Sequence, residues 1–374
     1  MNRATDGFAA RVITWQRAHG RHDLPWQASR DPYRIWLSEV MLQQTQVKTV
    51  IPYYLRFLEE FEHVGALADA PLSRVMELWS GLGYYSRARN LHRCARAVMH
   101  DHGGQFPRSA AGLATLPGIG ASTAAAIAAF AFGERAAILD GNVKRVLARH
   151  FGVEGWPGTR SVEQQLWDIA RTELPASDIE PYTQGLMDLG ADLCSRSRPG
   201  CERCPVRQTC VAHALRRESE IPARRPPRAV PEKEVFMLLL VCGAEVLLEQ
   251  RPPAGIWGGL ISVPECAPMS QSALVDHVRR QFGLRVIEAR AFEPFRHAFT
   301  HYRLLAHPVL LEVQDSPLRQ AQTQTIEMPG NAMDAREDSR RWVGIDNAQS
   351  QALPAPVRTL LMRLAVEISS RSAD

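Results

Sequence analysis

The chain has 374 residues, of which 45% are hydrophobic and 22% charged, and its formal net charge is +4. This composition excludes a wholly disordered or collagen-like chain, and at about 150 residues per domain the length suggests two domains. The longest apolar stretches, residues 124–132 and 235–242, fall short of the roughly 20 residues of a membrane span, and residues 1–17 lack a signal peptide's apolar run. We therefore expect a cytoplasmic protein without a membrane partner.

Positive charge is concentrated in the first part of the chain. Residues 1–230 hold 29 Lys and Arg against 23 Asp and Glu, whereas residues 231–374 hold 15 against 17. An excess of basic side chains favours a polyanionic partner for the first part, although an imbalance of this size also suits an ordinary solvated surface.

From residue 8 to about residue 213 the apolar residues recur with helical spacing, which predicts an all-α domain. Within it, Glu39 is the only charged residue between Arg34 and Lys48. Burial among apolar neighbours would raise its pKa and retain the proton that a general acid needs, but a Glu on the polar face of a helix is the more common case. The polar residues 43–46 follow and could donate to base edges or fill a gap in a duplex.

The segment LPGIG, residues 116–120, stands between two helical stretches. Gly118 and Gly120 would let the backbone approach another group closely and free N–H groups at a helix start, where a phosphate oxygen can bind. Such a motif is most often an ordinary turn. The basic helix that follows, with Lys144 and Arg145, favours the phosphate interpretation.

Asp140 precedes Gly141 and Asn142 at the expected start of that basic helix. An Asp at this place usually caps the helix, and spacing alone favours the cap. The functional alternative is a carboxylate that the helix N-terminus keeps ionised and directs at developing positive charge.

Four of the seven cysteines lie within seventeen residues, with the spacing C-x6-C-x2-C-x5-C. They are Cys194, Cys201, Cys204 and Cys210. In a cytosolic chain such a group indicates thiolate ligands rather than disulfides, and four thiolates can hold one zinc ion or one iron–sulfur cubane. Zinc sites usually take two C-x2-C pairs. Since one such pair is present, the spacing favours iron–sulfur and leaves zinc open.

Residues 221–234 hold four prolines and three arginines, which predicts an extended linker. After it, the pattern predicts two strands around a Gly-Ala turn (235–242 and 243–251), a helix (270–282) and a further strand (302–311). We therefore expect a multidomain protein. Its parts would be an all-α domain at 1–220 that includes the cysteine loop 194–210, a linker at 221–233 and an α/β domain at 234–368.

Several segments together resemble the adenine DNA glycosylases of the MutY type, within the helix-hairpin-helix glycosylases that include endonuclease III. These segments are SEVMLQQTQV (38–47), GLGYYSRARNL (81–91), LPGIG (116–120), LDGNVKRVLAR (139–149), MDLGADLC (187–194) and the four cysteines. The resemblance is dense from about Trp15 to Cys210 and looser beyond. It implies a monomeric, nucleoid-associated enzyme that removes adenine paired with 8-oxoguanine or guanine in double-stranded DNA, and one [4Fe–4S] cluster per chain.

The resemblance also implies roles for individual residues. Glu39 would protonate the leaving adenine at N7, and Asp140 would stabilise the oxocarbenium-like sugar or attack it transiently, as in a retaining glycosidase. The remaining roles are as follows: Asn142 and Ser122 orient the catalytic groups, Trp26 and Gln184 line the adenine pocket, Gln44 and Tyr84 stand beside 8-oxoguanine, and Gly118 with Gly120 holds a phosphate.

Ser122 bears on strand cleavage. Relatives that cleave the DNA backbone carry a Lys at this place, where its amine forms a Schiff base with the sugar. A Ser there predicts base excision without efficient strand cleavage, with Lys144 as a weak adventitious trap for the sugar.

The second domain resembles a Nudix fold at residues 250–265. A catalytic Nudix helix needs glutamates for its metal, but the matching register holds Leu274, His277 and Val278, so hydrolysis is not expected. What remains would be a domain that reads the 8-oxoguanine strand. The family's Phe-Ser-His loop is here Phe299-Thr300-His301. Thr keeps the hydroxyl of Ser but has a more restricted rotamer, and this departure from the family could alter the discrimination of 8-oxoguanine from guanine.

Three other functions are weighed against this one. A glycosylase for another base, such as thymine opposite guanine, is disfavoured by Gln184 and by the second domain. A non-catalytic mismatch-binding protein would need neither Glu39 nor Asp140. A pyrophosphohydrolase would need the carboxylates that the Nudix-like segment lacks.

Overall fold

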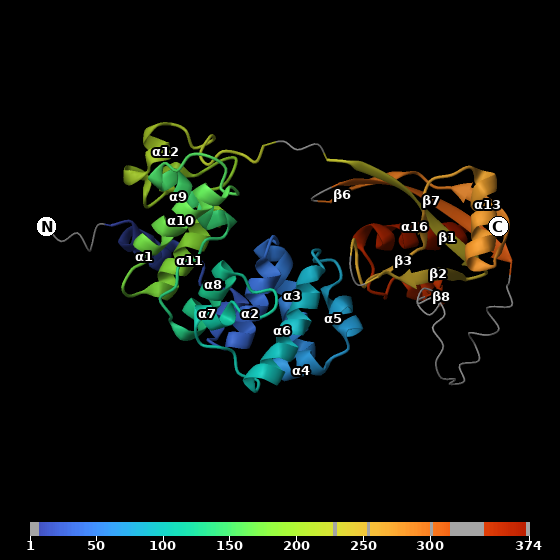
Figure 1. Cartoon of the computed structure of the whole chain (residues 1–374), viewed down its shortest axis with the longest axis horizontal. Coiled ribbons are helices and arrows are strands. Elements are labelled where there is room, and N and C mark those ends of the chain that lie inside the picture. The colour runs from blue at the N-terminus through green and yellow to red at the C-terminus, as the bar shows by residue number, and fades with distance from the viewer. Residues whose placement is uncertain (1–6, 227–229, 253–254, 300–301, 315–339, 372–374) are drawn as a thin grey trace. The chain divides into compact units, whose positions relative to one another are not determined.

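This computed structural model describes residues 7–226, 230–252, 255–299, 302–314 and 340–371. Internal contacts divide the chain into two compact units (Figure 1). The first contains residues 1–70 and 87–227, and the second contains residues 71–86 and 228–374. The short segment 71–86 therefore clusters with the second unit, although the chain around it belongs to the first.

The first unit is helical, which confirms the expected all-α fold of this part (Figure 1). Its helices are α1 (Phe8–His19), α2 (Pro32–Leu42), α3 (Val47–Glu60), α4 (Val64–Asp69), α6 (Ser86–His102), α7 (Ala110–Leu113), α8 (Ala121–Phe132), α9 (Gly141–Phe151), α10 (Arg160–Thr172), α11 (Ile179–Asp188) and α12 (Val211–Ala214). A 3-10 turn, η1 (Pro25–Ala28), precedes α2, and a π-helical turn, η2 (Leu189–Leu193), continues α11.

Helices α8 and α9 both contribute buried residues to the core of this unit. Helix α8 is largely alanine, and residues 124–129 are all buried, so neighbouring helices approach its backbone closely. Both helices end at a glycine in the left-handed conformation, Gly133 and Gly152, each with φ of 69°. Their buried faces share one core with α1, α10 and α11.

The second unit is built on a mixed sheet of β1 (Glu232–Cys242), β2 (Glu245–Gln250), β3 (Ile261–Ser262), β4 (Glu265–Cys266), β5 (Arg285–Ala291), β6 (Phe295–Ala298), β7 (Arg303–Gln314) and β8 (Arg340–Gly344). The main order is β3-β2-β1-β7-β5, and β4, β6 and β8 pair with β1, β7 and β2. Strands β1 and β7 run parallel, whereas the other pairs are antiparallel.

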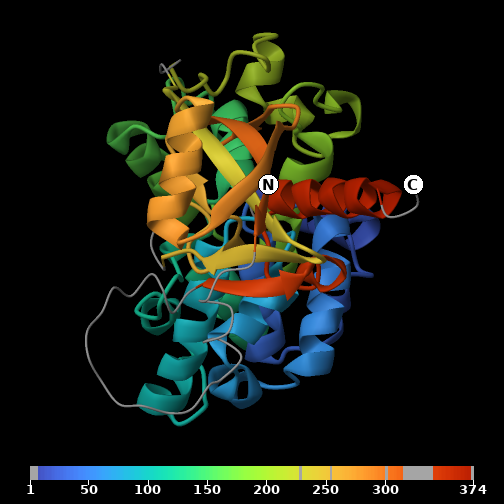
Figure 2. The ribbon, with the colours of Figure 1, turned by 90° about the vertical axis from the view of Figure 1, so that its right-hand side faces the viewer.

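Helices cover both faces of this sheet. Alternate residues of β1, Leu238 and Leu240, share a core with Leu274 and Val278 of α13 (Gln271–Phe282). Met237 and Leu239, which alternate with them and face the other side of the sheet, are also fully buried. Helix α16 (Ala355–Arg371) lies on this other side (Figures 1 and 2). The shorter helices of this unit are α5 (Leu72–Trp79) and α15 (Ile345–Ala348).

The predicted elements of this unit are confirmed. Strands β1 and β2 meet at Cys242 and Glu245, around a turn at Gly243 with φ of 58°. Ser270 caps α13 as expected for a helix at 270–282, and β7 covers most of the strand expected at 302–311. The described residues of the expected linker that precede β1, 221–226 and 230–231, have neither helix nor strand, whereas its last residues already belong to β1, which begins at Glu232.

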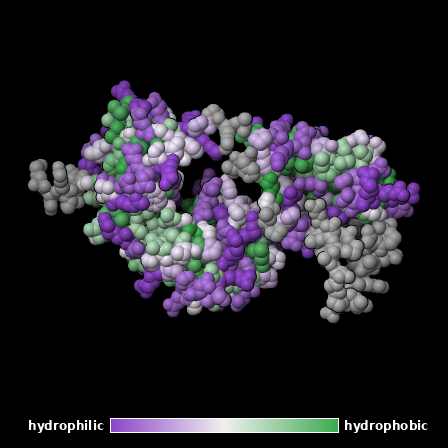
Figure 3. Space-filling model, viewed as in Figure 1, coloured by the Kyte–Doolittle hydropathy of each residue, from purple (hydrophilic) through white to green (hydrophobic). Residues whose placement is uncertain are grey.

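Among the described residues, no helix combines the length and apolarity needed to cross a bilayer. Figure 3 shows hydrophilic residues over most of the face that it presents.

Candidate functional site

Glu39 lies near the end of α2, a helix that Asp31 begins by accepting from the N–H of Tyr33 over 2.9 Å. Protein atoms surround the carboxyl although a small part of the residue reaches the surface. Among the described residues, no donor forms a hydrogen bond with it. Burial raises the pKa of Glu39 to about 8, and the charge of Asp140 acts in the same direction.

The C-terminus of α2 is held by Arg87, a residue that the sequence analysis missed. Its guanidinium donates to the carbonyl oxygens of Val40 (2.9 Å) and Met41 (2.7 Å) and to the hydroxyl of Thr45 (3.0 Å). A buried cation on the last carbonyls of a helix stabilises that end. The sequence pattern could have indicated this role, because Arg87 stands four residues before Leu91 and therefore shares the buried face of α6.

Gln44 and Tyr84, both expected beside 8-oxoguanine, have unusual backbone conformations. Their φ angles are 58° and 49°, in the left-handed region that residues other than glycine rarely adopt. Such conformations persist only where the surrounding structure imposes them, and they are frequent at functional sites. In the first unit, the bond from Arg87 to Thr45 holds the residue directly after Gln44.

Asp140 caps α9, as its spacing predicted. Its carboxylate accepts from the N–H of Val143 over 2.7 Å, and the N–H of Asn142 also stabilises it. Burial nevertheless raises the pKa of Asp140, against these N–H groups and against Lys144 and Arg145, which lower it. Desolvation thus has a larger effect on the pKa of Asp140 than the helix N-terminus and the two cations together.

Glu39 and Asp140 are 101 positions apart in the sequence, and the structure brings their carboxyl groups close enough for their charges to interact. Only Asp140 has hydrogen-bond donors and nearby cations that stabilise a negative charge. When the pair shares one proton, that proton therefore resides on Glu39. The site thus pairs a neutral carboxyl with an ionised one.

Ser122 and Asn142 hold the chain on either side of Asp140. The Ser122 hydroxyl, at the start of α8, accepts from the N–H of Leu139 over 2.9 Å. Asn142 accepts from Arg145 Nη2 over 2.9 Å. A Cβ on Gly190 would lie 2.5 Å from that of Asn142, so only a glycine in η2 allows this approach.

Arginines on α9 connect this helix to the cysteine loop. Arg145 donates to the carbonyl oxygens of Gly190 (2.5 Å) and Cys194 (2.7 Å). Arg149, one turn further and 4% exposed, donates to the Cys194 sulfur (3.3 Å) and to the Ser195 carbonyl (2.7 Å). The helix that begins at Asp140 therefore also supports the first cysteine.

In the LPGIG segment the two glycines differ. Gly118 has φ of 79°, and a Cβ there would lie 2.6 Å from that of Asn90, so this position requires glycine. Gly120 is the N-cap of α8 with φ of −84° and open space around it. Lys144, expected near DNA, forms an ion pair with Glu163 at 2.6 Å.

The two residues expected in the adenine pocket are both buried. Trp26, in η1, packs edge-to-face on Tyr54 with 5.4 Å between ring centroids. Gln184 lies on α11 and is 8% exposed, and its side-chain NH₂ donates to Asp188 over 2.8 Å.

The four clustered cysteines line one cavity, together with apolar side chains of Val146, Leu189, Leu193 and Val206. Their thiols interact electrostatically with one another, and burial raises the pKa of Cys201 and of Cys204 to about 11. Desolvated thiols of this kind become ligands when a metal replaces their protons. With a nitrogen donor already on the Cys194 sulfur, this donor set fits an iron–sulfur cluster, and four thiolates also fit zinc.

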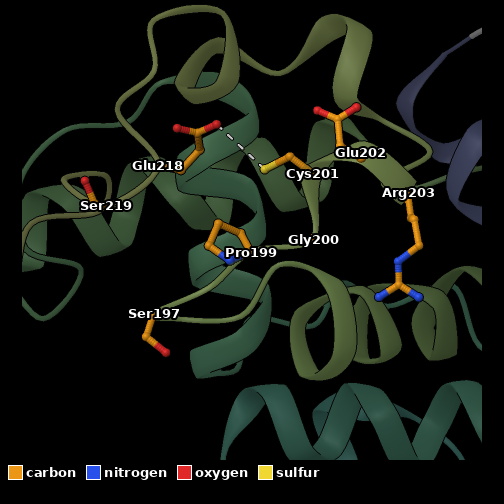
Figure 4. A pocket seen from close by; sticks show the side chains of 8 residues that line it. All are labelled: Ser197, Pro199, Gly200, Cys201, Glu202, Arg203, Glu218 and Ser219. Atoms are coloured by element: carbon orange, nitrogen blue, oxygen red, sulfur yellow. Dashed lines mark hydrogen bonds between the residues drawn. The ribbon is translucent and has the colours of Figure 1, made fainter.

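The Cys201 sulfur faces a carboxylate. Figure 4 shows its side chain pointing at Glu218, 3.7 Å away, while Arg203 points elsewhere. His213 lies 2.7 Å from the same Glu218 oxygen. These three residues are close enough to share a metal ion. Cys201 and Glu218 also line a cavity of 380 Å³, together with Ser197, residues 199–203 and Ser219.

In the second unit, Phe299 belongs to a cluster of aromatic side chains. It stacks on Tyr302 with 4.7 Å between centroids and meets His297 edge-on at 4.6 Å. Trp257, which has φ of 53°, lies 5.4 Å from Phe299. Thr300 and His301, the other two residues of the expected recognition loop, lie outside the described residues.

Comparison with known proteins identifies relatives of both units. Residues 37–172 match the model of the HhH-GPD superfamily base excision DNA repair protein, and residues 235–363 match the NUDIX domain. The adenine DNA glycosylase of Buchnera aphidicola subsp. Baizongia pistaciae is 33% identical over 358 residues, covering 96% of each chain. That of Homo sapiens is 33% identical and covers 79% of this chain and 65% of its own length.

Among solved structures, a thermostable thymine-DNA glycosylase is 32% identical, with a TM-score of 0.50. The match covers 56% of this chain and 95% of that one.

Proposed function

Because the chain belongs to the adenine DNA glycosylases, base excision repair enzymes that remove adenine from DNA, we propose that it acts on adenine paired with 8-oxoguanine or guanine. The observation that carries the proposed chemistry is the pair of Glu39 and Asp140, in which one carboxyl keeps its proton and the other has donors for a negative charge. This division of roles is what hydrolysis of a glycosidic bond needs.

The proposed reaction begins with the adenosine turned out of the duplex, which costs a few kcal/mol of stacking and pairing. Glu39 transfers its proton to N7 of the adenine, so that the base departs neutral. The positive charge that develops on the sugar is stabilised by the Asp140 carboxylate, which either remains an ion or attacks transiently. Ser122 and Asn142 position the chain around Asp140 through their hydrogen bonds.

A water molecule then adds to C1′ of the sugar and loses a proton, so the proposed product is an abasic site in an intact strand. A strand-cleaving enzyme of this kind needs an amine where Ser122 stands, and Lys144 is engaged by Glu163. Gly118 and Gly120 would hold a phosphate at the start of α8.

We propose that the four cysteines hold one [4Fe–4S] cluster. A cluster bound there would cross-link the loop 194–210 and order it against α9. Arg145 and Arg149 donate to this loop at Cys194.

The second unit is proposed to read the strand opposite the adenine, with Gln44 and Tyr84 beside 8-oxoguanine. Adenine DNA glycosylases align with this chain over nearly its whole length, including the second unit. On α13 the single carboxylate is Asp276, and Leu274 and Val278 pack into the core, so no pyrophosphohydrolase activity is proposed. We propose that the helical glycosylase domain spans residues 1–220, the linker residues 221–233 and the Nudix-like domain residues 234–368.

Thymine opposite guanine is the second candidate substrate, because a thymine-DNA glycosylase matches over half of the chain. Single-turnover assays with A:8-oxoguanine, A:G, T:G and A:T duplexes, with and without alkali, separate the candidates. Fast adenine release opposite 8-oxoguanine, with strand breaks only after alkali, is expected. Thymine release, or tight binding without any release, would overturn the proposal.

A further inference from the structure

The Gln184 side chain is held by a fully buried carboxylate. Asp188 lies one turn further along α11 and has no exposed surface. Its Oδ1 accepts from Gln184 Nε2 (2.8 Å) and from Arg21 Nε (2.7 Å), and its Oδ2 accepts from the backbone N–H of Arg21 (3.0 Å). The guanidinium of Arg21 completes an ion pair at 2.6 Å.

This arrangement determines which end of the Gln184 amide faces the rest of the site. A carboxylate paired with an arginine has acceptors only, so the NH₂ group of Gln184 must face it and the amide oxygen must point elsewhere. Among the described residues, that oxygen accepts no hydrogen bond. An acceptor without a partner among these residues, on a side chain that is otherwise buried, is suited to a ligand that donates.

Close packing holds the two helices that carry this arrangement. A Cβ on Gly185 would lie 2.7 Å from Val12 Cγ1, so α11 and α1 approach closely beside Gln184. A Cβ on Gly20 would lie 3.0 Å from Asp188 Oδ2. Arg21 is linked onward, because its carbonyl accepts from Gln27, the neighbour of Trp26, over 2.9 Å.

We infer that Asp188 is a positioning residue for base specificity, which fixes Gln184 as an acceptor for the exocyclic amine of adenine. The inference rests on the proposed place of Gln184 in the adenine pocket. On its major-groove edge adenine offers an N7 acceptor and an N6 donor, whereas guanine offers two acceptors. A protonated Glu39 and an accepting Gln184 match adenine and oppose a base with a carbonyl at position 6.

Substrate analogues test this inference with a readout that a merely structural role does not move. Single-turnover rates are measured for adenine, purine and hypoxanthine, each opposite 8-oxoguanine. Hypoxanthine carries an oxygen in place of the amine, and purine carries neither. The ratio of the adenine rate to the hypoxanthine rate is compared between wild type and Asp188→Asn, because intrinsic reactivity and general damage cancel in that comparison.

An Asn at position 188 can either accept or donate, so it no longer holds the amide in one orientation. The ratio is expected to fall about tenfold or more, as when one hydrogen bond in a built site is lost. Asp178→Asn is the matched control. It removes an exposed carboxylate that pairs with Arg17 at the start of the same helix, and the ratio should stay unchanged.

A second variant keeps the inference testable should Asp188→Asn not fold. Gln184→Leu removes the amide oxygen and should lose the preference for adenine over hypoxanthine. Equal slowing of all substrates by Asp188→Asn, or an unchanged ratio in Gln184→Leu, overturns the inference alone. A wild-type protein that releases no adenine overturns the proposed function and this inference together.

Discussion

The backbone N–H of Leu139 donates to the hydroxyl of Ser122 over 2.9 Å, and this bond ties the first turn of α8 to the residue directly before Asp140. The hairpin proposed to hold a phosphate is therefore connected to the proposed catalytic carboxylate by one hydrogen bond. Binding of the DNA backbone and placement of Asp140 depend on the same short segment.

Ser122→Ala should weaken this connection. The mutation leaves the N–H of Leu139, a residue with 4% exposure, without its partner, which costs about 1–3 kcal/mol. We expect a lower midpoint of thermal unfolding and a slower single-turnover rate, measured by calorimetry and by quenched-flow excision. Ser109→Ala, at the cap of α7, removes a similar hydroxyl contact away from the carboxylates and should leave the rate unchanged. Equal rates for both variants would contradict the connection.

Asp140→Asn should abolish excision and preserve DNA binding. Asn also caps helices well, so α9 is expected to form, while the charge that stabilises the sugar is lost. The single-turnover rate should fall by about a thousandfold or more, as for loss of a principal electrostatic group. Binding of an A:8-oxoguanine duplex, measured by fluorescence anisotropy, should change little. Equal loss of binding and excision would show that Asp140 is only a structural cap.

Excision should decline at alkaline pH because the proposed general acid, Glu39, must carry its proton. With its pKa at about 8, the protonated fraction falls about tenfold per pH unit above that value. The single-turnover rate should therefore drop through pH 8 to 9 in wild type. In Glu39→Gln, which cannot transfer a proton, the residual rate should lack this decline. A wild-type rate that is constant from pH 7 to 9.5 would contradict the role of Glu39.

The same shift predicts that Glu39 limits the stability of the fold in alkali. A carboxyl whose pKa is higher in the folded state than in the unfolded state loses its proton more easily after unfolding. Deprotonation at high pH therefore lowers the free energy of unfolding. Its effect on stability is neutral below the ordinary value of 4.5 and becomes unfavourable as pH rises toward about 8. At pH 9, the free energy of unfolding of Glu39→Gln, measured by denaturant titration, should therefore exceed that of wild type by a few kcal/mol. At pH 4.5 the two proteins should have the same free energy of unfolding. Identical curves at pH 9 would exclude the shift.

The cysteine site should contain iron. We expect the purified protein to be yellow-brown with about four irons per chain, and Cys204→Ser to lose both colour and metal. Cys94→Ser provides the control, since Cys94 is buried in α6 apart from the four clustered cysteines. A colourless protein with one zinc per chain would overturn the assignment of the cluster.

The sequence alone was sufficient for features that depend on short-range spacing. The cysteine spacing, the proline-rich segment before β1 and the strands around Gly243 follow from neighbours within a few residues, and the structure shows the strands where they were expected. Asp140 also occupies the helix cap that its local context predicted. These features depend on backbone conformational preferences and on the short distance along the chain between the cysteines, both of which are local properties of the sequence.

The tertiary structure alone decided which distant groups meet. The burial of Glu39, on a helix that packs against α8, and its nearness to Asp140 arise only when the helices of the first unit assemble, and no local pattern encodes that approach. Arg87 and Asp188 became recognisable only through partners 46 and 167 positions away. A pKa and an amide orientation depend on the full set of surrounding atoms, so they are set when the helices pack and not by the residues beside them in the chain.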